Sequence, residues 1–274
     1  MIVQTYDHKI SCSESFFKIL ITAVLLFAGV LDRVSLAQVA VKAEVCRCKI
    51  VEVLPHDVNS YTQGLFFYKG QLYESSGQYG ASFFRKVDLY KGTALQSFNF
   101  PDEYFAEGAT VLGNLLYILT WQQRVVFVYD INTFKPIKQF FNPREEGWGL
   151  TTDGKDLIMS DGSSFLFFMD PATFKEKRRI TVKLDGKTID RLNELEYIKG
   201  EIWANVYQED FILIIDPSTG IVRKVVDCKN ILPPSMRTSK TDVLNGIAYN
   251  PLTDRIYITG KYWPKMFRIT LSSR

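Results

Sequence analysis

Five similar tripeptides recur along the chain: Gln63-Gly64-Leu65, Glu107-Gly108-Ala109, Trp148-Gly149-Leu150, Asn193-Glu194-Leu195 and Asn245-Gly246-Ile247. Each begins with a polar or aromatic residue, and consecutive tripeptides are separated by about 40 to 50 residues, a period at which small β-sheets repeat in β-propellers. The repeat therefore predicts a propeller in which each tripeptide heads the first strand of one sheet.

Turn-forming residues divide the intervening stretches into short strands. Four aspartates end predicted strands just before a turn, where the carboxylate can accept hydrogen bonds from the next backbone amides: Asp88, Asp130, Asp170 and Asp216. The fifth repeat stops after three strands, whereas residues 49–54 form a lone alternating strand near the start. We expect that strand to pair with the last sheet, which removes exposed edges. The fold prediction is an all-β, five-bladed β-propeller over residues 45–274, closed by an N-terminal strand.

The bulk composition is that of an ordinary globular protein. Hydrophobic residues make up 46% of the 274 residues, charged residues make up 23%, and the net charge is +3. So small a charge gives no reason to expect a nucleic-acid partner, and we expect a monomer.

The N-terminal segment is a separate unit. Residues 16–31 are apolar apart from Lys18 and Thr22, and Ser35-Leu36-Ala37 resembles a small-residue cleavage site. The apolar run after Lys18 has about 13 residues, fewer than the roughly 20 that span a membrane. Residues 1–37 are interpreted as a signal peptide or, alternatively, an uncleaved signal anchor. Either predicts the secretory pathway: the endoplasmic reticulum lumen, the membrane facing that lumen, the vacuole or the outside.

Cysteine and histidine are sparse. If Cys12 is lost with the leader, Cys46, Cys48 and Cys228 remain, either as free thiols or with a bridge from Cys46 or Cys48 to Cys228 in an oxidising lumen. The chain has two histidines, which excludes a histidine-rich catalytic zinc site.

The heads of the repeats are the candidate site. First strands of propeller blades line the central channel, so residues far apart in sequence should meet at its mouth. Residues at the ends of second strands should join them. This set comprises Gln63, Glu107, Trp148, Asn193 and Asn245, with Trp121, Asn205 and Lys261.

This set predicts proton-transfer chemistry. A carboxylate among indole rings would have a raised pKa, which suits proton transfer near neutral pH, and Lys261 with the amides could bind a developing oxyanion. The alternatives are a solvated glutamate and tryptophans that belong to the core.

Several longer segments carry a resemblance. They read YTQGL from Tyr61, ESSGQYG from Glu74, AEG from Ala106, LNELE from Leu192, IWANV from Ile202 and LNGIA from Leu244. From about residue 49 to the C-terminus, the chain resembles plant-type glutaminyl-peptide cyclotransferases. The resemblance implies a five-bladed propeller that converts the N-terminal glutaminyl residues of peptides and proteins to pyroglutamyl residues and releases ammonia.

The resemblance also implies residue roles. Glu107 would be the catalytic proton shuttle, and the substrate would contact Gln63, Trp121, Trp148, Asn193 and Lys261. Tyr207 stands where relatives commonly have tryptophan, so it would alter one pocket wall. The reaction needs no catalytic cofactor. The family allows a structural calcium or zinc ion, for which the sequence offers no ligand motif.

Two other classes of function stay open. One is a non-catalytic propeller that binds peptide N-termini in the same pocket. The other is a calcium-dependent, lactonase-like hydrolase, whose ligands could be mimicked by Glu107, Asn193, Glu194 and Asn245.

Overall fold

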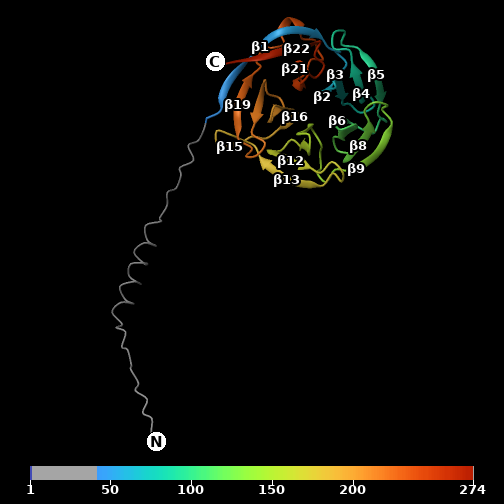
Figure 1. The fold of residues 1–274 in the computed structure, drawn as a ribbon. Coiled ribbons are helices and arrows are strands. Elements are labelled where there is room, and N and C mark those ends of the chain that lie inside the picture. Colours follow the sequence, from blue (N-terminus) through green and yellow to red (C-terminus); the bar gives the residue numbers. More distant parts are fainter. Residues whose placement is uncertain (2–41, 274) are drawn as a thin grey trace. The chain divides into compact units, whose positions relative to one another are not determined.

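The computed structural model describes Met1 and residues 42–273 (Figure 1). The predicted signal peptide or anchor, apart from Met1, lies outside the described residues. Within them, the secondary structure consists of β-strands and one 3-10 turn, η1 (Pro234–Met236), so the all-β prediction is confirmed. In the described part of the chain, no helix has the length and hydropathy of a membrane span.

Three antiparallel four-stranded sheets follow one another in sequence order. The first contains β2 (Thr62–Tyr68), β3 (Gln71–Ser76), β4 (Phe83–Val87) and β5 (Ala94–Asn99). The second contains β6 (Ala106–Leu112), β7 (Leu115–Thr120), β8 (Val125–Asp130) and β9 (Pro136–Phe141). The third contains β10 (Leu150–Thr152), β11 (Leu157–Ser160), β12 (Phe165–Met169) and β13 (Glu176–Thr181). A small hairpin, β14 (Lys183–Leu184) and β15 (Lys187–Thr188), follows the third sheet.

The rest of the chain forms one eight-stranded sheet with the order β16-β17-β18-β19-β1-β22-β21-β20. One half contains β16 (Leu192–Ile198), β17 (Glu201–Val206), β18 (Phe211–Ile215) and β19 (Val222–Asp227). The other half contains β20 (Leu244–Asn250), β21 (Arg255–Gly260) and β22 (Lys265–Ser273), with β1 (Glu44–Pro55) between the halves. Figure 1 shows the sheets around a common centre, with β2, β6 and β16 near it and β5, β9 and β13 at the rim. The architecture is propeller-like.

Strand β1 joins the two ends of the described chain. It pairs antiparallel with β22 from Cys46↔Ser273 to Pro55↔Lys265, as the sequence predicted. It also pairs in parallel with β19 from Glu44↔Lys224 to Arg47↔Asp227. This second pairing, and the start of the strand at Glu44 rather than Lys49, were not predicted. Residues 44–48 alternate too weakly in polarity to indicate a strand without the two neighbours that hold it.

The repeated tripeptides have a structural reason. In four inner strands the pairing register shifts at the tripeptide, between Thr62 and Gly64, Ala106 and Ala109, Leu192 and Leu195, and Leu244 and Ile247. Such bulges re-aim a side chain. Glycine within the bulge lets neighbouring inner strands approach closely: a Cβ on Gly108 would lie 2.5 Å from the Trp148 carbonyl oxygen, to which the Gly108 amide donates a hydrogen bond.

The predicted aspartate turns are also present. Asp88 Oδ1 accepts the amides of Tyr90 and Lys91, and Asp130 Oδ1 accepts those of Asn132 and Thr133. Asp170 and Asp216 repeat the same pattern two and three residues ahead. Each turn reverses the chain between the third and fourth strands of a sheet.

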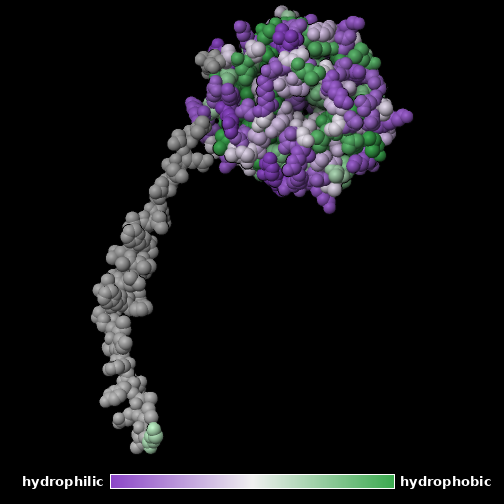
Figure 2. Space-filling model, viewed as in Figure 1, coloured by the Kyte–Doolittle hydropathy of each residue, from purple (hydrophilic) through white to green (hydrophobic). Residues whose placement is uncertain are grey.

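The hydrophobic core is divided among neighbouring sheets. The described residues form five buried clusters. One cluster packs Phe84 of the first sheet with Ile118 of the second, and another packs Tyr257 of β21 with Leu72 of β3. Each four-stranded sheet, and each half of the eight-stranded sheet, shares one cluster with the neighbour on either side. Apolar burial therefore fixes the sheets around the centre and holds the inner strands together. Hydrophilic side chains predominate on the face seen in Figure 2, with hydrophobic residues between them.

Candidate active site

One pocket brings together the seven site residues that the family resemblance implied. It is lined by Tyr61, Gln63, Gln78, Phe105, Glu107, Trp121, Trp148, Asn193, Tyr207 and Lys261. Gln63, Glu107 and Asn193 lie on the bulged inner strands, and Trp121, Tyr207 and Lys261 directly follow the second strands β7, β17 and β21. The propeller-like arrangement therefore creates the pocket from positions that repeat in the sequence.

Glu107 is the carboxylate at the centre of this pocket. Its side chain is buried, and Gln63 Nε2 donates a hydrogen bond to its Oε1 at 2.9 Å. Burial raises the pKa of Glu107 well above its usual range; the positive charge of Lys261 partly opposes this, and Glu146 adds to it. A carboxyl group with a raised pKa can both accept and donate a proton near neutral pH.

Asn245 supports this contact from behind rather than lining the pocket. Its Nδ2 donates to the backbone oxygen of Thr62 at 2.8 Å and to Gln63 Oε1 at 3.3 Å. The oxygen of the Gln63 amide therefore faces Asn245, and its NH2 group faces Glu107. Asn205 is also buried, where its Oδ1 accepts the Gly246 amide at 2.9 Å. These two asparagines therefore lie behind the residues that line the pocket and do not line it themselves.

Lys261 is a buried cation on an aromatic surface. Its Nζ lies 4.4 Å from the ring centre of Tyr61 and 5.3 Å from that of Tyr207. Burial lowers the pKa of Lys261 to about 8, although Glu107 and Asp242 act in the opposite direction. The turn that carries Lys261 is fixed by its backbone amide, which donates to Val243 O at 2.9 Å. The side chain is thus a buried amine whose pKa of about 8 lies below its usual range.

Aromatic side chains form the walls. Trp121 packs edge-on against Phe105 at 5.6 Å, and Trp148 packs against Tyr207 at 5.8 Å with an interplanar angle of 81°. The Trp148 indole also rests on Gly162, where a Cβ would come within 2.7 Å of the ring. Aromatic walls around few polar groups are typical of small-ligand pockets.

Glu146, which the sequence did not indicate, fixes the Trp148 indole. Its Oε2 accepts the Trp148 Nε1–H at 2.7 Å, and its Oε1 accepts Gln122 Nε2 at 3.0 Å. Sequence reasoning also missed Tyr61, Gln78 and Phe105 as lining residues. Tyr61 and Gln78 lie within the segments that carry the family resemblance, and Phe105 is next to another, so their proximity to these motifs was an available signal.

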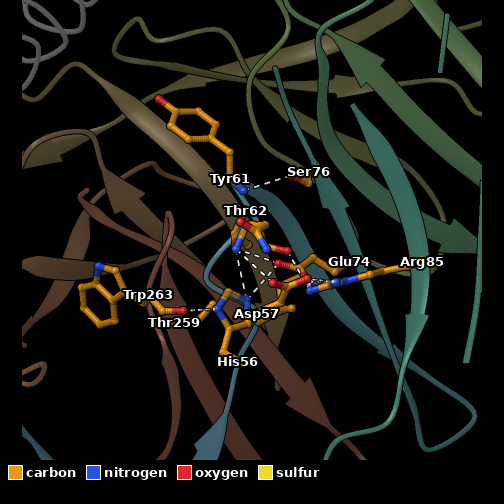
Figure 3. Close-up of polar contacts among 12 residues, drawn as sticks. His56, Asp57, Tyr61, Thr62, Glu74, Ser76, Arg85, Thr259 and Trp263 are labelled. Atoms are coloured by element: carbon orange, nitrogen blue, oxygen red, sulfur yellow. Dashed lines mark hydrogen bonds and ion pairs between the residues drawn. The ribbon is translucent and has the colours of Figure 1, made fainter. Parts of the chain in front are cut away.

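A buried polar cluster holds the segment before Gln63 (Figure 3). Glu74 Oε2 accepts Arg85 Nε at 2.9 Å, while its Oε1 contacts His56 Nε2 at 3.0 Å and accepts Thr62 Oγ1 at 2.7 Å. Arg85 also donates to Asp57 and Ser60, both at 2.7 Å. The Tyr61 ring points away from this cluster, while its backbone amide donates to Ser76 Oγ. The positive charge of Arg85 and the hydrogen bonds hold the pKa of Glu74 below its usual range despite burial, with His56 contributing.

The described residues show no cluster of metal-ligating side chains. They contain no group of three or more His, Cys, Asp or Glu side chains that could hold an ion. Glu194, a candidate in the lactonase-like alternative, uses its two carboxylate oxygens for the backbone amides of Leu65 and Ile247, at 3.2 and 2.8 Å. Glu194 therefore links the inner strands β2 and β20 through its carboxylate.

Fold and pocket together define a propeller-like enzyme with one central carboxylate. A family model described as glutamine cyclotransferase matches residues 22–271. The glutaminyl-peptide cyclotransferase of Arabidopsis thaliana is 40% identical over 226 residues, which cover 81% of this chain and 71% of that protein. The crystal structure of Myxococcus xanthus glutaminyl cyclase is similar with a TM-score of 0.79 at 32% identity, covering 85% of this chain and 100% of that one. The chain belongs to the glutamine cyclotransferase family, and it is therefore an acyltransferase.

Proposed function

We propose that this protein converts N-terminal glutaminyl residues of peptides and proteins to pyroglutamyl residues, with Glu107 as the proton shuttle. The observation that carries the proposal is the buried Glu107 carboxyl, which Gln63 orients in an aromatic pocket beside Lys261. The activity of the named relatives supports the same reaction.

The reaction is an intramolecular acyl transfer. The substrate α-amine attacks its own side-chain γ-carbonyl carbon, a C–N bond forms, and the former amide nitrogen leaves as ammonia. Glu107 accepts the proton that the attacking amine loses and donates it to the leaving nitrogen. No water is consumed, so one carboxyl group that acts first as base and then as acid is sufficient.

The other pocket residues bind and orient the substrate. Lys261 and the Asn193 amide stabilise the negative charge that develops on the γ-carbonyl oxygen. Trp121, Trp148 and Tyr207 hold the glutaminyl side chain in a folded conformation that brings amine and carbonyl together. Tyr207 offers a smaller wall than tryptophan, which leaves more room beside Trp148.

We further propose that the sheets form a closed, five-bladed ring with β1 as the fourth strand of the last blade. Two observations support this arrangement. Each of the five core clusters joins two neighbouring sheets or the two halves of the eight-stranded sheet. In addition, β1 pairs with β22 through nine residue pairs. Closure would leave no free sheet edge between the first and last parts of the propeller, because β1 pairs with both β19 and β22.

The proposal includes no catalytic cofactor, because every proton and charge of the reaction has a partner among the pocket residues. The apolar segment at residues 16–31 supports a location in the secretory pathway, as a lumenal, anchored, vacuolar or secreted protein. We also propose that the protein can bind a structural calcium or zinc ion, as the family allows, although the described residues contain no cluster of three or more His, Cys, Asp or Glu side chains that marks its ligands.

The test is ammonia release from a glutaminyl dipeptide amide by the purified protein in the presence of a chelator. We expect activity in the wild type and a loss of about 10²- to 10⁴-fold in Glu107→Gln. Equal activity in both proteins would remove Glu107 as the shuttle. No activity in the folded wild type would favour a non-catalytic binding protein, and activity that requires added calcium would favour the hydrolase.

A further inference from the structure

Cys48 and Cys228 face each other where β1 leaves β19. Their sulfur atoms are 3.0 Å apart, about 1 Å longer than a disulfide bond. Cys228 is buried and Cys48 is partly exposed, and both are free thiols.

The strand register explains why these two cysteines meet. β1 and β19 pair in parallel with Cys46 opposite Val226 and Arg47 opposite Asp227. The next step along both strands brings Cys48 opposite Cys228. Neighbouring strands are about 4.8 Å apart, which lies within the Cα separation that a disulfide accepts.

Cys46 is excluded as the partner by the same register. It lies two residues earlier on β1, about 6.6 Å back along the strand, and its thiol contacts Glu44 at 3.5 Å. Both cysteines of the Cys46-Arg47-Cys48 segment project to one side of the strand, so only the register, not the sequence, distinguishes them.

We propose that Cys48 and Cys228 form a disulfide that fixes β1 to β19. A low-molecular-weight disulfide such as oxidised glutathione supplies the oxidant. The more exposed Cys48 thiolate attacks one glutathione sulfur and releases one glutathione thiol. The Cys228 thiolate then attacks Cys48 Sγ and releases the second. Two protein thiols are oxidised, and the two electrons and two protons go to the two glutathione thiols.

The bond would act on the strand that joins the chain ends. Without it, β1 is held to β19 by four residue pairs near its start. The crosslink closes a loop from residue 48 to residue 228, and long loops restrict the unfolded chain most. The oxidised protein therefore unfolds at a higher temperature, by roughly 5 to 15 °C.

The test uses the full chain with Cys12→Ser, so that the cysteine outside the described residues cannot interfere. The reduced protein is incubated with oxidised glutathione, then alkylated under denaturing conditions and mapped by mass spectrometry. We expect a Cys48–Cys228 peptide pair and an alkylated Cys46. A Cys46–Cys228 pair, or three alkylated thiols after oxidation, would overturn the proposal.

Matched variants separate the bond from general redox effects. Oxidation should raise the unfolding midpoint of the parent and of Cys46→Ser, and it should leave Cys48→Ser and Cys228→Ser unchanged relative to their reduced forms. Because each variant is compared with its own reduced form, any packing loss from serine cancels. An equal rise in all four proteins would contradict the assignment.

Discussion

The Gln63 side-chain amide donates a 2.9 Å hydrogen bond to the Glu107 carboxylate across two neighbouring inner strands. The two residues are 44 positions apart and head successive repeats. The contact therefore makes the sheet arrangement itself part of the proposed proton shuttle, because any slip between β2 and β6 would separate donor and acceptor.

Replacing Gln63 with leucine should impair activity and shift its pH dependence. Removal of a donor to the charged form raises the pKa of Glu107 further, so the acidic limb of the kcat/KM profile should move to higher pH. A hydrogen bond to a charged group contributes about 1.5–3 kcal/mol, which predicts a roughly 10- to 100-fold loss. The exposed Gln96→Leu is the control; an unshifted limb in Gln63→Leu would refute the coupling.

Lys261 should produce the alkaline limb of the activity profile. Its lowered pKa of about 8 means that the ammonium loses its proton as the pH rises through that value, and with it the charge that stabilises the oxyanion. Lys261→Arg keeps the charge at high pH, so the limb near pH 8 should disappear while some activity remains. Persistence of that limb in Lys261→Arg would assign it to the substrate amine or another group.

Glu146 should act on Glu107 through its charge and on Trp148 through its hydrogen bond. The Glu146 carboxylate contributes to the raised pKa of Glu107, so Glu146→Gln should move the acidic limb to lower pH. Glutamine retains an oxygen for Trp148 Nε1, whereas Glu146→Ala does not and should raise KM several-fold with less effect on kcat. The exposed neighbour Glu145→Gln should change neither quantity; a similar shift in that control would indicate a general charge effect.

The Glu74–Arg85 pair should be a major stability determinant. Removing one partner of a buried ion pair costs about 3–5 kcal/mol, so Arg85→Met should lower the free energy of unfolding by that order at pH 7. Because the pKa of Glu74 is lowered in the folded protein, the stability from this pair is present above the usual glutamate pKa of about 4.3 and is lost as the pH falls through the lower folded value.

Denaturant titrations at pH 7 and pH 4 check this prediction. In Arg85→Met, the unpaired Glu74 takes up a proton more readily, so the difference from the wild type should be smaller at pH 4. The double variant Glu74→Gln/Arg85→Met should recover part of the loss. A constant difference at both pH values would mean that Arg85 stabilises through packing alone.

The sequence by itself determined the repeat, the turns and most of the site. A glycine or glutamate after a polar head marks the bulge of an inner strand, and an aspartate before a turn binds the amides ahead of it. Each of these two patterns lies within a few residues, so both can be recognised in the sequence without knowledge of the fold. Because the starts of inner strands and the ends of second strands meet at one mouth of a propeller, Glu107 and Asn193 could be predicted to converge with Lys261.

Tertiary structure alone decided which side chains contact each other. The parallel register of β1 and β19 selects Cys48 over Cys46, Asn245 proves to orient Gln63 rather than to line the pocket, and Glu146 reaches Trp148 from a loop without a repeat signal. The burial that raises the pKa of Glu107 also depends on residues from several sheets. The contacts of Cys48 and Asn245 depend on the register between strands that are distant in sequence, and the Glu146 contact depends on side-chain direction within a loop; local residue patterns specify neither.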